Sequence, residues 1–211
     1  EIQRGNVERP THRNTSWDWA RFEVCAQKWV DLSEGDYGVS LLNDCKYGHD
    51  VRDNLVRITL LRSPTVPDPE ADKGTHSFSY SILPHAGSWD METVAEAYQL
   101  NDPPIVFLNE APGNSRLSEA KSPLACLVSV DNDNVVIETV KRSEDGSSIV
   151  VRLYECRRSR GRVTLKAGFP VTGAWRTDLL EKGIEQLKAG PDEVEFEIKP
   201  YEIMTIKLTT G

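Results

Sequence analysis

The stretch DYGVSLLNDCKYGHD, residues 36–50, gathers carboxylate, thiol, amine, phenol and imidazole side chains into fifteen positions. Such groups bind ligands and exchange protons, and binding residues often lie at the ends of rigid elements. Within it, Tyr37, Val39 and Leu41 alternate with intervening residues, which predicts a strand over 37–42. The chemistry of this stretch therefore depends on the residues just after that strand.

A polar loop comes directly after the predicted strand, and its side chains able to bond a ligand are Asn43, Asp44, Lys46 and Tyr47. Asn, Asp and Gly also tolerate tight turns and left-handed backbone geometry. Two interpretations are therefore open. The loop binds a ligand at a strand end, or it is the polar turn that closes a buried strand.

Other reactive residue types lack the spacing that their chemistry needs. The four histidines are His12, His49, His76 and His85, and they form no HxH or HExxH pair. His76 and His85 are expected at opposite ends of one strand. We therefore expect no metal site. No GxSxG or comparable nucleophile context surrounds any serine or cysteine. The five tryptophans could stack on sugars, but packing in a core or an interface is the commoner fate of large aromatics: Trp17, Trp19, Trp29, Trp89 and Trp175.

The composition limits the classes of partner. A formal net charge of -8 and a pI near 5.1 disfavour nucleic acid and an anionic membrane surface, because both reward a basic patch. No apolar run approaches the roughly 18 residues of a membrane span. The four cysteines are widely spaced, without a CxxC pair, which indicates reduced thiols and a cytoplasmic protein. The chain begins with Glu, so we interpret it as a fragment of a longer protein.

Hydrophobic periodicity predicts an all-β, antiparallel chain. Apolar residues recur every second position over 58–60, 78–82, 149–153, 194–198 and 204–208, and the turn sequences SEGDYG, SEDGSS, SRGR and KAGPDE separate such runs. Two helices are expected. Ser88 caps the first, in which Met91, Val94, Ala95 and Tyr98 share a face, and the sequence WRTDLLEKGIEQL holds a short second one.

The apolar rhythm stops at NEAPGNSRLSEAKSP, which predicts a linker over 109–123. Residues 124–211 then form a small, immunoglobulin-like β-sandwich. Residues 1–108 form part of a larger antiparallel sandwich, because the segment NVERPTHRNTSWDWARFEV reads like the middle of a sheet. We expect this part to expose an apolar surface that missing sequence covers, and to self-associate when isolated.

Several long segments carry a resemblance to a known family. The segments THRNTSWDWARFEV, KWVDLSEGDYGVSLLNDCKYGHD and LVRITLLRSPTVPDPEADKGTHSFSYSILPH are similar to the C-terminal β region of the glycoside hydrolase family 38 α-mannosidases, closest to the cytosolic and bacterial branch. VVIETVKRSEDGSSIVVRLYE and YEIMTIKL resemble the small terminal sandwich of the same enzymes. The resemblance covers nearly the whole chain.

The resemblance implies a retaining exo-glycosidase that releases α-linked mannose from oligosaccharides. Its carboxylate nucleophile, its acid/base and its zinc ion belong to an N-terminal catalytic domain, whose motifs this chain lacks. We therefore expect the fragment to be inactive alone, with no cofactor of its own. Its implied partners are that catalytic domain and a mannose-containing oligosaccharide, and we expect a homo-oligomer with no nucleic-acid or membrane partner.

The resemblance also suggests a role for Arg62, since the family's C-terminal sandwich is thought to lend an arginine to the rim of the mannose site. Arg62 ends an alternating strand where Ser63-Pro64 turns the chain. With the loop residues Asn43, Asp44, Lys46 and Tyr47, it is predicted to face the catalytic domain. The alternative is a surface arginine paired with one of three nearby acids: Asp68, Glu70 or Asp72.

Two other classes of function stay open on the sequence alone. A carbohydrate-binding module would present exposed aromatic side chains in a groove. A purely structural assembly module would present a broad apolar face and no pocket.

Overall fold

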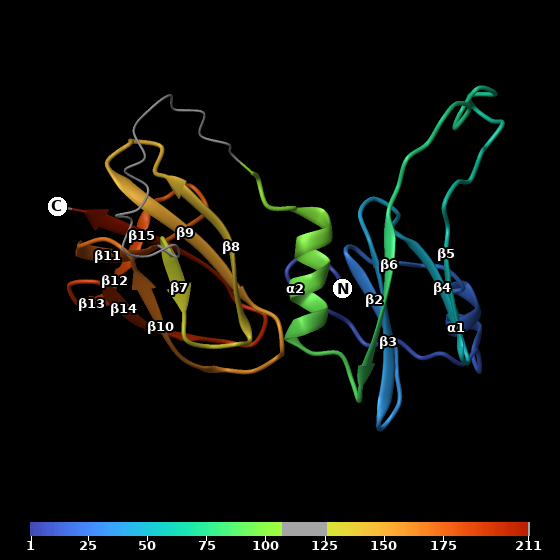
Figure 1. Ribbon diagram of the computed structural model, residues 1–211, viewed down its shortest axis with the longest axis horizontal. Helices are drawn as coiled ribbons and strands as arrows, with labels where there is room; N and C mark the ends of the chain where they lie inside the picture. The colour runs from blue at the N-terminus through green and yellow to red at the C-terminus, as the bar shows by residue number, and fades with distance from the viewer. Residues whose placement is uncertain (107–125, 211) are drawn as a thin grey trace, which may run out of the picture. The chain divides into compact units, whose positions relative to one another are not determined.

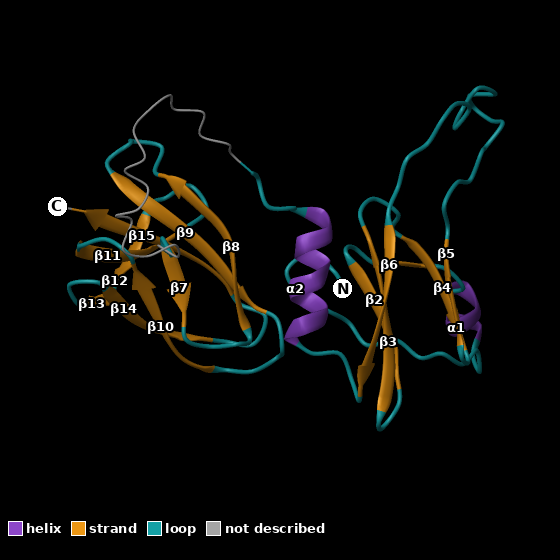
Figure 2. Ribbon diagram, viewed as in Figure 1, coloured by secondary structure: helices purple, strands orange, loops and turns teal. Residues whose placement is uncertain are grey.

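The computed structural model describes residues 1–106 and 126–210, which form antiparallel strands with two short helices (Figures 1 and 2). Contacts between Cα atoms divide the chain into unit 1, Glu1–Val106, and unit 2, Phe107–Gly211. Strands dominate both units, so the predicted all-β class is confirmed. The predicted linker over 109–123 lies outside the described residues.

Unit 1 contains two three-stranded antiparallel sheets. The first has the order β1-β4-β5, from β1 (Val24–Cys25), β4 (Gly48–Arg52) and β5 (Leu55–Ile58). The second has the order β2-β3-β6, from β2 (Trp29–Ser33), β3 (Tyr37–Asn43) and β6 (Tyr80–Ala86). A long connection without regular structure joins β5 to β6 and extends beyond the sheet (Figure 1). The predicted strand at 37–42 is confirmed as β3.

The helix α2 (Met91–Asn101) packs against one face of the β2-β3-β6 sheet. Asp90 caps this helix by accepting a hydrogen bond from the Glu92 amide at 2.8 Å, so the predicted cap at Ser88 is wrong. Of the predicted face, Val94 is buried and Ala95 is exposed, and the other buried residues of the helix are Thr93 and Ala97. The facing sheet residues are buried as well: Trp29, Ser40 and Leu42.

The opposite face of the β2-β3-β6 sheet is apolar and partly exposed. Leu41 lies between Val30 and Ile82 in the register, and cross-strand partners place their side chains on the same face. Val39 lies between Leu32 and Pro84 in the same way. We call these residues, together with Tyr37 and Tyr80 at the ends, the open sheet face; Tyr37, Tyr80 and Ile82 are each more than half exposed.

The segment before β1 differs from the prediction of a mid-sheet strand. It contains a five-residue helix, α1 (Ser16–Ala20), and no strand before Val24. Thr15 and Asp18 form a capping box: the Asp18 amide donates to the Thr15 hydroxyl at 3.2 Å, and the Thr15 amide donates to the Asp18 carboxylate at 2.9 Å. The hydrogen bonds that begin a helix therefore outweigh the aromatic and β-branched composition of this segment.

Unit 2 is built from two antiparallel sheets whose buried faces share one core. One sheet has the order β13-β14-β10-β7, from β7 (Val128–Val130), β10 (Gly161–Ala167), β13 (Lys188–Ala189) and β14 (Glu193–Ile198). The other has the order β12-β11-β15-β9-β8, from β8 (Val135–Arg142), β9 (Ser148–Glu155), β11 (Val171–Thr177), β12 (Gly183–Gln186) and β15 (Ile203–Thr210). Fully buried aliphatic residues of both sheets form the core, among them Val151, Leu153, Val163, Leu165 and Leu208.

The strands predicted from period-two alternation in unit 2 are confirmed as β9, β14 and β15. The second predicted helix is wrong: WRTDLLEKGIEQL spans the end of β11, a turn and β12. In the turn, Asp178 Oδ1 accepts hydrogen bonds from the Leu180 and Lys182 amides, both at 2.9 Å. Glu181 adopts a positive φ of 64°, which a helix does not allow.

Two predicted strands of unit 1 are shorter than their alternation suggested. β5 ends at Ile58, before Leu60, and β6 begins at Tyr80, after Phe78. His76 therefore lies outside the strand that contains His85. Ser63 has a positive φ of 48°, so the chain leaves the sheet direction just after Arg62.

Candidate functional site

The predicted rim loop begins with Asn43, which is fully buried and has a structural role. Its side-chain amide donates to the Gln27 carbonyl at 2.9 Å, and its Oδ1 accepts from the Lys46 amide at 2.7 Å. Its backbone carbonyl accepts from the Asn101 side chain of α2 at 3.0 Å. All these contacts are internal, so Asn43 fixes the strand end and offers no group to a ligand.

Asp44 also has a structural role, because it forms hydrogen bonds with the backbone of Ser79. Its Oδ2 accepts from the Ser79 amide at 2.9 Å, and its own amide donates to the Ser79 carbonyl at 3.2 Å. Hydrogen bonds from the Cys45 thiol and from Ser79 lower the pKa of Asp44, and the same contact raises the pKa of Cys45. Asp44 therefore joins the end of β3 to the segment that leads into β6.

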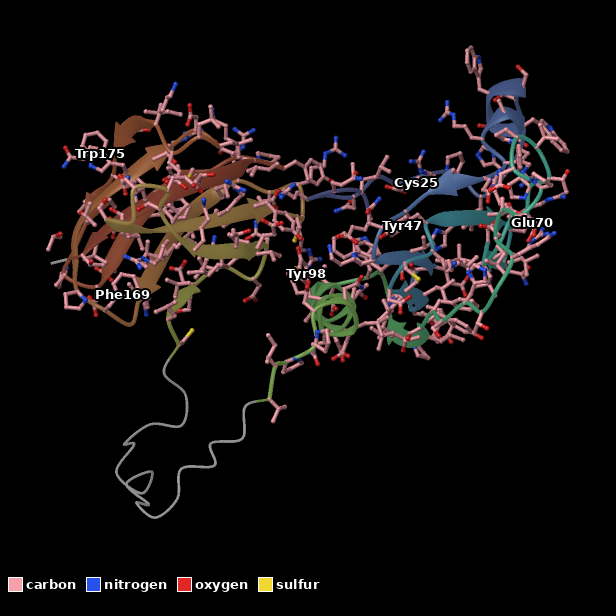
Figure 3. The ribbon with its side chains drawn as sticks, turned by 90° about the horizontal axis from the view of Figure 1, so that it is seen from above. Cys25, Tyr47, Glu70, Tyr98, Phe169 and Trp175 are labelled. Carbon is pink, nitrogen blue, oxygen red and sulfur yellow. The ribbon has the colours of Figure 1, made fainter. Side chains whose placement is uncertain are left out.

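Lys46, Tyr47 and Arg62 are brought together by the fold. They line one open cleft of about 570 Å³ between the β3–β4 loop and the β5–β6 connection, which we call the rim cleft. Lys46 Nζ lies 5.1 Å from the centroid of the Phe78 ring. Tyr47 is labelled in Figure 3. Its side chain is about half exposed. The structure thus unites three of the five predicted rim residues, and Asn43 and Asp44 lie outside the lining.

Arg62 is 70% exposed and forms an ion pair with Glu23, so it is a paired surface arginine, but its partner is none of the predicted acids Asp68, Glu70 or Asp72. The Thr59 hydroxyl donates to the other oxygen of Glu23 at 2.6 Å. Glu23 and Arg62 both belong to the lining of the rim cleft. Sequence reasoning missed Glu23, because it lies 39 positions before Arg62 and no local pattern connects the two.

A second cleft of unit 1, also of about 570 Å³, was not predicted. Its lining includes Val24, Trp29, Val30 and Leu32 from the sheets and the polar side chains of Glu8, Arg9, His12, Arg13 and Arg21. Arg13 Nη2 donates to Asp50 at 2.7 Å and its guanidinium lies 5.5 Å from the Trp19 ring centroid. This cleft is lined by residues of β1, β2 and β4 and by the segment that contains α1.

Trp29 and Trp89 pack together as expected, whereas Trp17, Trp19 and Trp175 are exposed. Trp29 is buried, and its ring lies 4.8 Å from that of Trp89. Trp17 and Trp19, on α1, are 73% and 57% exposed, and Trp175 is 41% exposed. Exposed aromatic side chains of this size are candidates for contact with a partner or a sugar.

A buried cluster under α2 has the residue types of a catalytic triad but not the geometry. His85 Nε2 lies 2.7 Å from Asp31 Oδ1 and 3.3 Å from Ser40 Oγ, so one nitrogen faces both groups. A triad needs the histidine between its partners, with one nitrogen toward each. Ser40 is also fully buried, so this cluster joins strands to α2 rather than acting on a substrate. Gly38 makes room for it, because a Cβ there would lie 2.3 Å from His85 Cε1.

His49 of β4 is fully buried. Burial lowers its pKa, although the Tyr47 carbonyl, which lies 3.2 Å from Nδ1, favours the charged form. Burial therefore disfavours the charged imidazole, and the Nδ1–H donates to the Tyr47 carbonyl. This contact with Tyr47 stabilises the β3–β4 loop, and His49 is not part of the rim-cleft lining.

Within residues 1–106 and 126–210, no group of three or more His, Cys, Asp or Glu side chains could hold a metal ion. In the same residues, no helix is both long and apolar enough to cross a membrane. All four cysteines are free thiols: Cys25, Cys45, Cys126 and Cys156.

The two units match two sequence families. Residues 1–70 match "Glycosyl hydrolases family 38 C-terminal domain", and residues 134–206 match "Glycosyl hydrolases family 38 C-terminal beta sandwich domain". "Alpha-mannosidase 2C1" of Homo sapiens is 41% identical over 214 residues, which cover 99% of this chain and 20% of that protein. "Alpha-mannosidase" of Saccharomyces cerevisiae is 37% identical over 231 residues, which cover 99% of this chain and 21% of that protein.

A solved structure shares the fold. An alpha-mannosidase from Enterococcus faecalis superposes with a TM-score of 0.73 at 21% identity, covering 97% of this chain and 23% of that one. The chain thus spans about a fifth of the length of the curated relatives that it matches.

Proposed function

This chain belongs to the C-terminal β region of glycosyl hydrolase family 38, and on that premise we propose that it is the non-catalytic part of an α-mannosidase. The whole enzyme releases terminal α-linked mannose from oligosaccharides, as a retaining glycosidase. The relatives named above support this assignment, because each is an alpha-mannosidase about five times as long as this chain. The four free thiols support a cytoplasmic location.

The observation that carries the proposed role is the open sheet face of unit 1. A monomeric domain rarely leaves an apolar sheet face partly exposed, as this one is at Tyr37, Tyr80 and Ile82. Here Leu41 and its neighbours Val30 and Ile82 form a continuous apolar row across three strands. We assign the preceding catalytic domain of the same polypeptide as the cover of this face.

The described residues themselves favour support over catalysis. The one serine–histidine–aspartate cluster in that part of the chain is buried and has the wrong geometry. The family's zinc does not fit here, because no set of ligands gathers in the residues described. We therefore derive no zinc step for this chain and place that ion in the catalytic domain.

The proposed activity has a direct test. The full-length protein should hydrolyse an aryl α-mannoside, and residues 1–211 alone should show no turnover, with or without added zinc. An aryl β-mannoside is the matched control substrate. Turnover by the purified 1–211 chain would contradict the supporting role, and a full-length protein that cleaves neither substrate would contradict the α-mannosidase assignment.

We further propose that the rim cleft borders the mannose site in the whole enzyme, with Arg62 as its polar contact. A guanidinium offers a planar fork of donors that can hold sugar hydroxyls or orient a carboxylate. The fold supports this role because Glu23 fixes Arg62 beside Lys46 and Tyr47. Asn43 and Asp44 support the loop that carries those two residues.

Arg62→Lys in the full-length enzyme should lower kcat/KM. The loss corresponds to roughly 1–3 kcal/mol of transition-state stabilisation, the scale of a charge-assisted hydrogen bond. Lysine keeps the charge but cannot reproduce the planar fork. Steady-state kinetics and a thermal melt measure the two effects separately. Arg57→Lys is the control, since Arg57 is an exposed arginine of unit 1 that pairs with Asp50 outside the cleft. Unchanged kinetics for Arg62→Lys, or a loss that only tracks a lower Tm, would remove Arg62 from the rim.

A carbohydrate-binding role is a second candidate, favoured by the exposure of Trp17 and Trp19 on α1. Aromatic rings in that position can stack on the apolar face of a sugar. Titration of the chain with mannose oligosaccharides, monitored by tryptophan fluorescence, separates this candidate from the supporting role. A change that Trp17→Ala and Trp19→Ala abolish would favour it.

A further inference from the structure

One edge of the strand β2 has no strand partner among the described residues. β2 is an outer strand of the β2-β3-β6 sheet and pairs there with β3. The other outer strand, β6, contains Pro84, which has no backbone N–H to donate to a further strand. β2 contains neither proline nor lysine, the residues that commonly protect an exposed edge. The edge of β2 is therefore the one that is open to another strand.

Alternation along β2 fixes which of its backbone groups face the open edge. The Lys28 carbonyl accepts a hydrogen bond from the amide of the last residue of β3 at 2.9 Å, so Lys28 faces β3. Successive residues of an antiparallel strand direct their backbone groups to opposite sides. Val30 and Leu32 therefore face β3 as well. The backbone groups of Asp31 and Ser33 face the open edge.

Glu1 already lies against this edge (Figure 1). Its nitrogen donates to the Trp29 carbonyl at 2.9 Å, and its carbonyl accepts from the Gln27 amide at 3.1 Å. At Glu1 the chain thus runs from Trp29 toward Gln27, opposite to the direction of β2. Followed backward from Glu1, the same line leads toward Asp31 and Ser33. A chain that continues before Glu1 is therefore directed along the open edge, antiparallel to β2.

The surroundings of the Glu1 nitrogen suit an uncharged backbone amide. Burial lowers the pKa of the Glu1 amine to about 6, because the charged form loses contact with water. The amide of a continuing chain carries no charge and can make the same hydrogen bond to Trp29. The Glu1 carboxylate accepts from the Lys28 amide at 2.7 Å, which holds the residue at the start of β2.

The second cleft of unit 1 follows the same edge and provides room for a strand. Its lining includes Glu1 and every residue of β2, Trp29–Ser33. Val24 of β1 and Val51 of β4 belong to the same lining. A cleft that combines free backbone groups with apolar side chains fits an extended peptide, which pairs through its main chain and packs through alternate side chains.

We propose that the residues immediately before Glu1 in the longer polypeptide form a strand in this cleft, antiparallel to β2. The inference rests on the proposed function, in which this chain is the C-terminal part of a longer enzyme. The direction of the backbone at Glu1 selects this segment over any other occupant, because the preceding residues have to leave Glu1 along the edge.

The bond between Glu1 and Trp29 sets the register of the proposed strand. The second and fourth residues before Glu1 lie opposite Asp31 and Ser33, with which they exchange hydrogen bonds. The first and third residues before Glu1 lie opposite the two residues of β2 that face β3. Their side chains join the open sheet face, so we expect both to be apolar.

Hydrogen exchange of single backbone amides, compared between the full-length enzyme and residues 1–211, tests the strand. The amides of Asp31 and Ser33 should exchange at least about 100-fold more slowly in the full-length enzyme, because only there do they find an acceptor. The amides of Val30 and Leu32 are the internal control, since they face β3 and should be protected at both lengths. Equal exchange of Asp31 and Ser33 at the two lengths, whether fast or slow, would overturn the proposal.

Substitution of the second residue before Glu1 by proline, in the full-length enzyme, identifies the occupant. Proline removes the N–H directed at the Asp31 carbonyl, so the Asp31 amide should exchange at least about 10-fold faster than in the unsubstituted enzyme. Proline at the third residue before Glu1 is the matched control, because the N–H there points away from β2. It should leave the exchange of Asp31 within about 3-fold.

Protection of Asp31 that survives proline at the second residue would show that another segment or a second copy covers the edge, and would overturn the proposal. If that variant also loses protection at Val30, the sheet itself has opened, and the comparison of the two chain lengths decides alone. Neither measurement uses mannoside turnover. A failure of this inference is therefore distinguishable from a failure of the α-mannosidase assignment.

Discussion

Glu155→Ala should lower the free energy of unfolding of unit 2 by about 3–5 kcal/mol, the upper part of the range for single substitutions. Glu155 is fully buried at the end of β9. Its carboxylate accepts four hydrogen bonds of 2.7–3.0 Å, from the Asn134 side chain and from the amides of Arg157, Ser159 and Tyr201. Alanine leaves all four donors without their acceptor.

These donors belong to separate segments that meet at one end of the sandwich. Arg157 and Ser159 lie in the turn between β9 and β10, and Tyr201 lies in the turn between β14 and β15. Each turn contains a non-glycine residue with a positive φ, 56° for both Arg158 and Tyr201. A left-handed residue of this kind is costly unless the surroundings hold it. The carboxylate therefore stabilises two turns at once, which explains the size of the expected loss.

Hydrogen exchange of the amides of β9 and β15 measures this effect in unit 2 alone. Glu155→Gln should cost less than alanine, because the remaining oxygen can keep part of the acceptor set. Glu197→Ala is the control, since Glu197 is exposed and makes only a surface ion pair with Arg162. That change should stay within about 0.5 kcal/mol. Equal protection in Glu155→Ala and the wild type would show that water replaces the carboxylate.

Period-two alternation was enough to predict β3, β14 and β15, because each of these strands has one more buried face. It also predicted β9, although both faces of that strand are largely buried. Glu155 shows the limit of that signal. An acidic residue at the end of an alternating strand looks exposed in the sequence. Its burial depends on two turns that approach it from 2 to 46 residues away.

Two predictions about helices were wrong for a related reason. The sequence DLLEKGIEQL has helical spacing, but the Asp178 side chain binds the amides that a helix would need, and the segment returns as β12. Conversely, α1 depends on the reciprocal bonds of Thr15 and Asp18 within a segment rich in aromatic residues. Local side-chain hydrogen bonds decided both cases against the hydrophobic pattern.

The sequence predicted where the candidate site lies, but not which of its residues reach the cleft. The strand end at Asn43 was located from turn chemistry, yet the structure makes Asn43 and Asp44 internal braces and leaves Lys46 and Tyr47 at the cleft. The partner of Arg62 could not be predicted, because Glu23 reaches it through the pairing of β1 with β4. Long-range strand pairing leaves no trace in a single sequence.

Ile82→Asp should destabilise the full-length enzyme by on the order of 3 kcal/mol or more, while it changes the isolated 1–211 chain by only about 0.5 kcal/mol. Ile82 is 64% exposed on the open sheet face, beside Leu41 in the register. In the isolated chain the new carboxylate stays in water. In the whole enzyme, if the catalytic domain covers this face, the substitution loses the burial of an isoleucine and removes a charge from water without a partner.

The comparison of the two chain lengths makes this prediction specific, because a local effect on β6 would lower the Tm of both equally. Thermal melts of the full-length protein and of residues 1–211 measure the difference. Ile203→Asp is the control: Ile203 is a 46% exposed isoleucine at the start of β15, in unit 2. It should shift the two lengths alike. If Ile82→Asp also shifts them alike, the open sheet face is not covered by the preceding domain, and the supporting role proposed for unit 1 loses the observation that carries it.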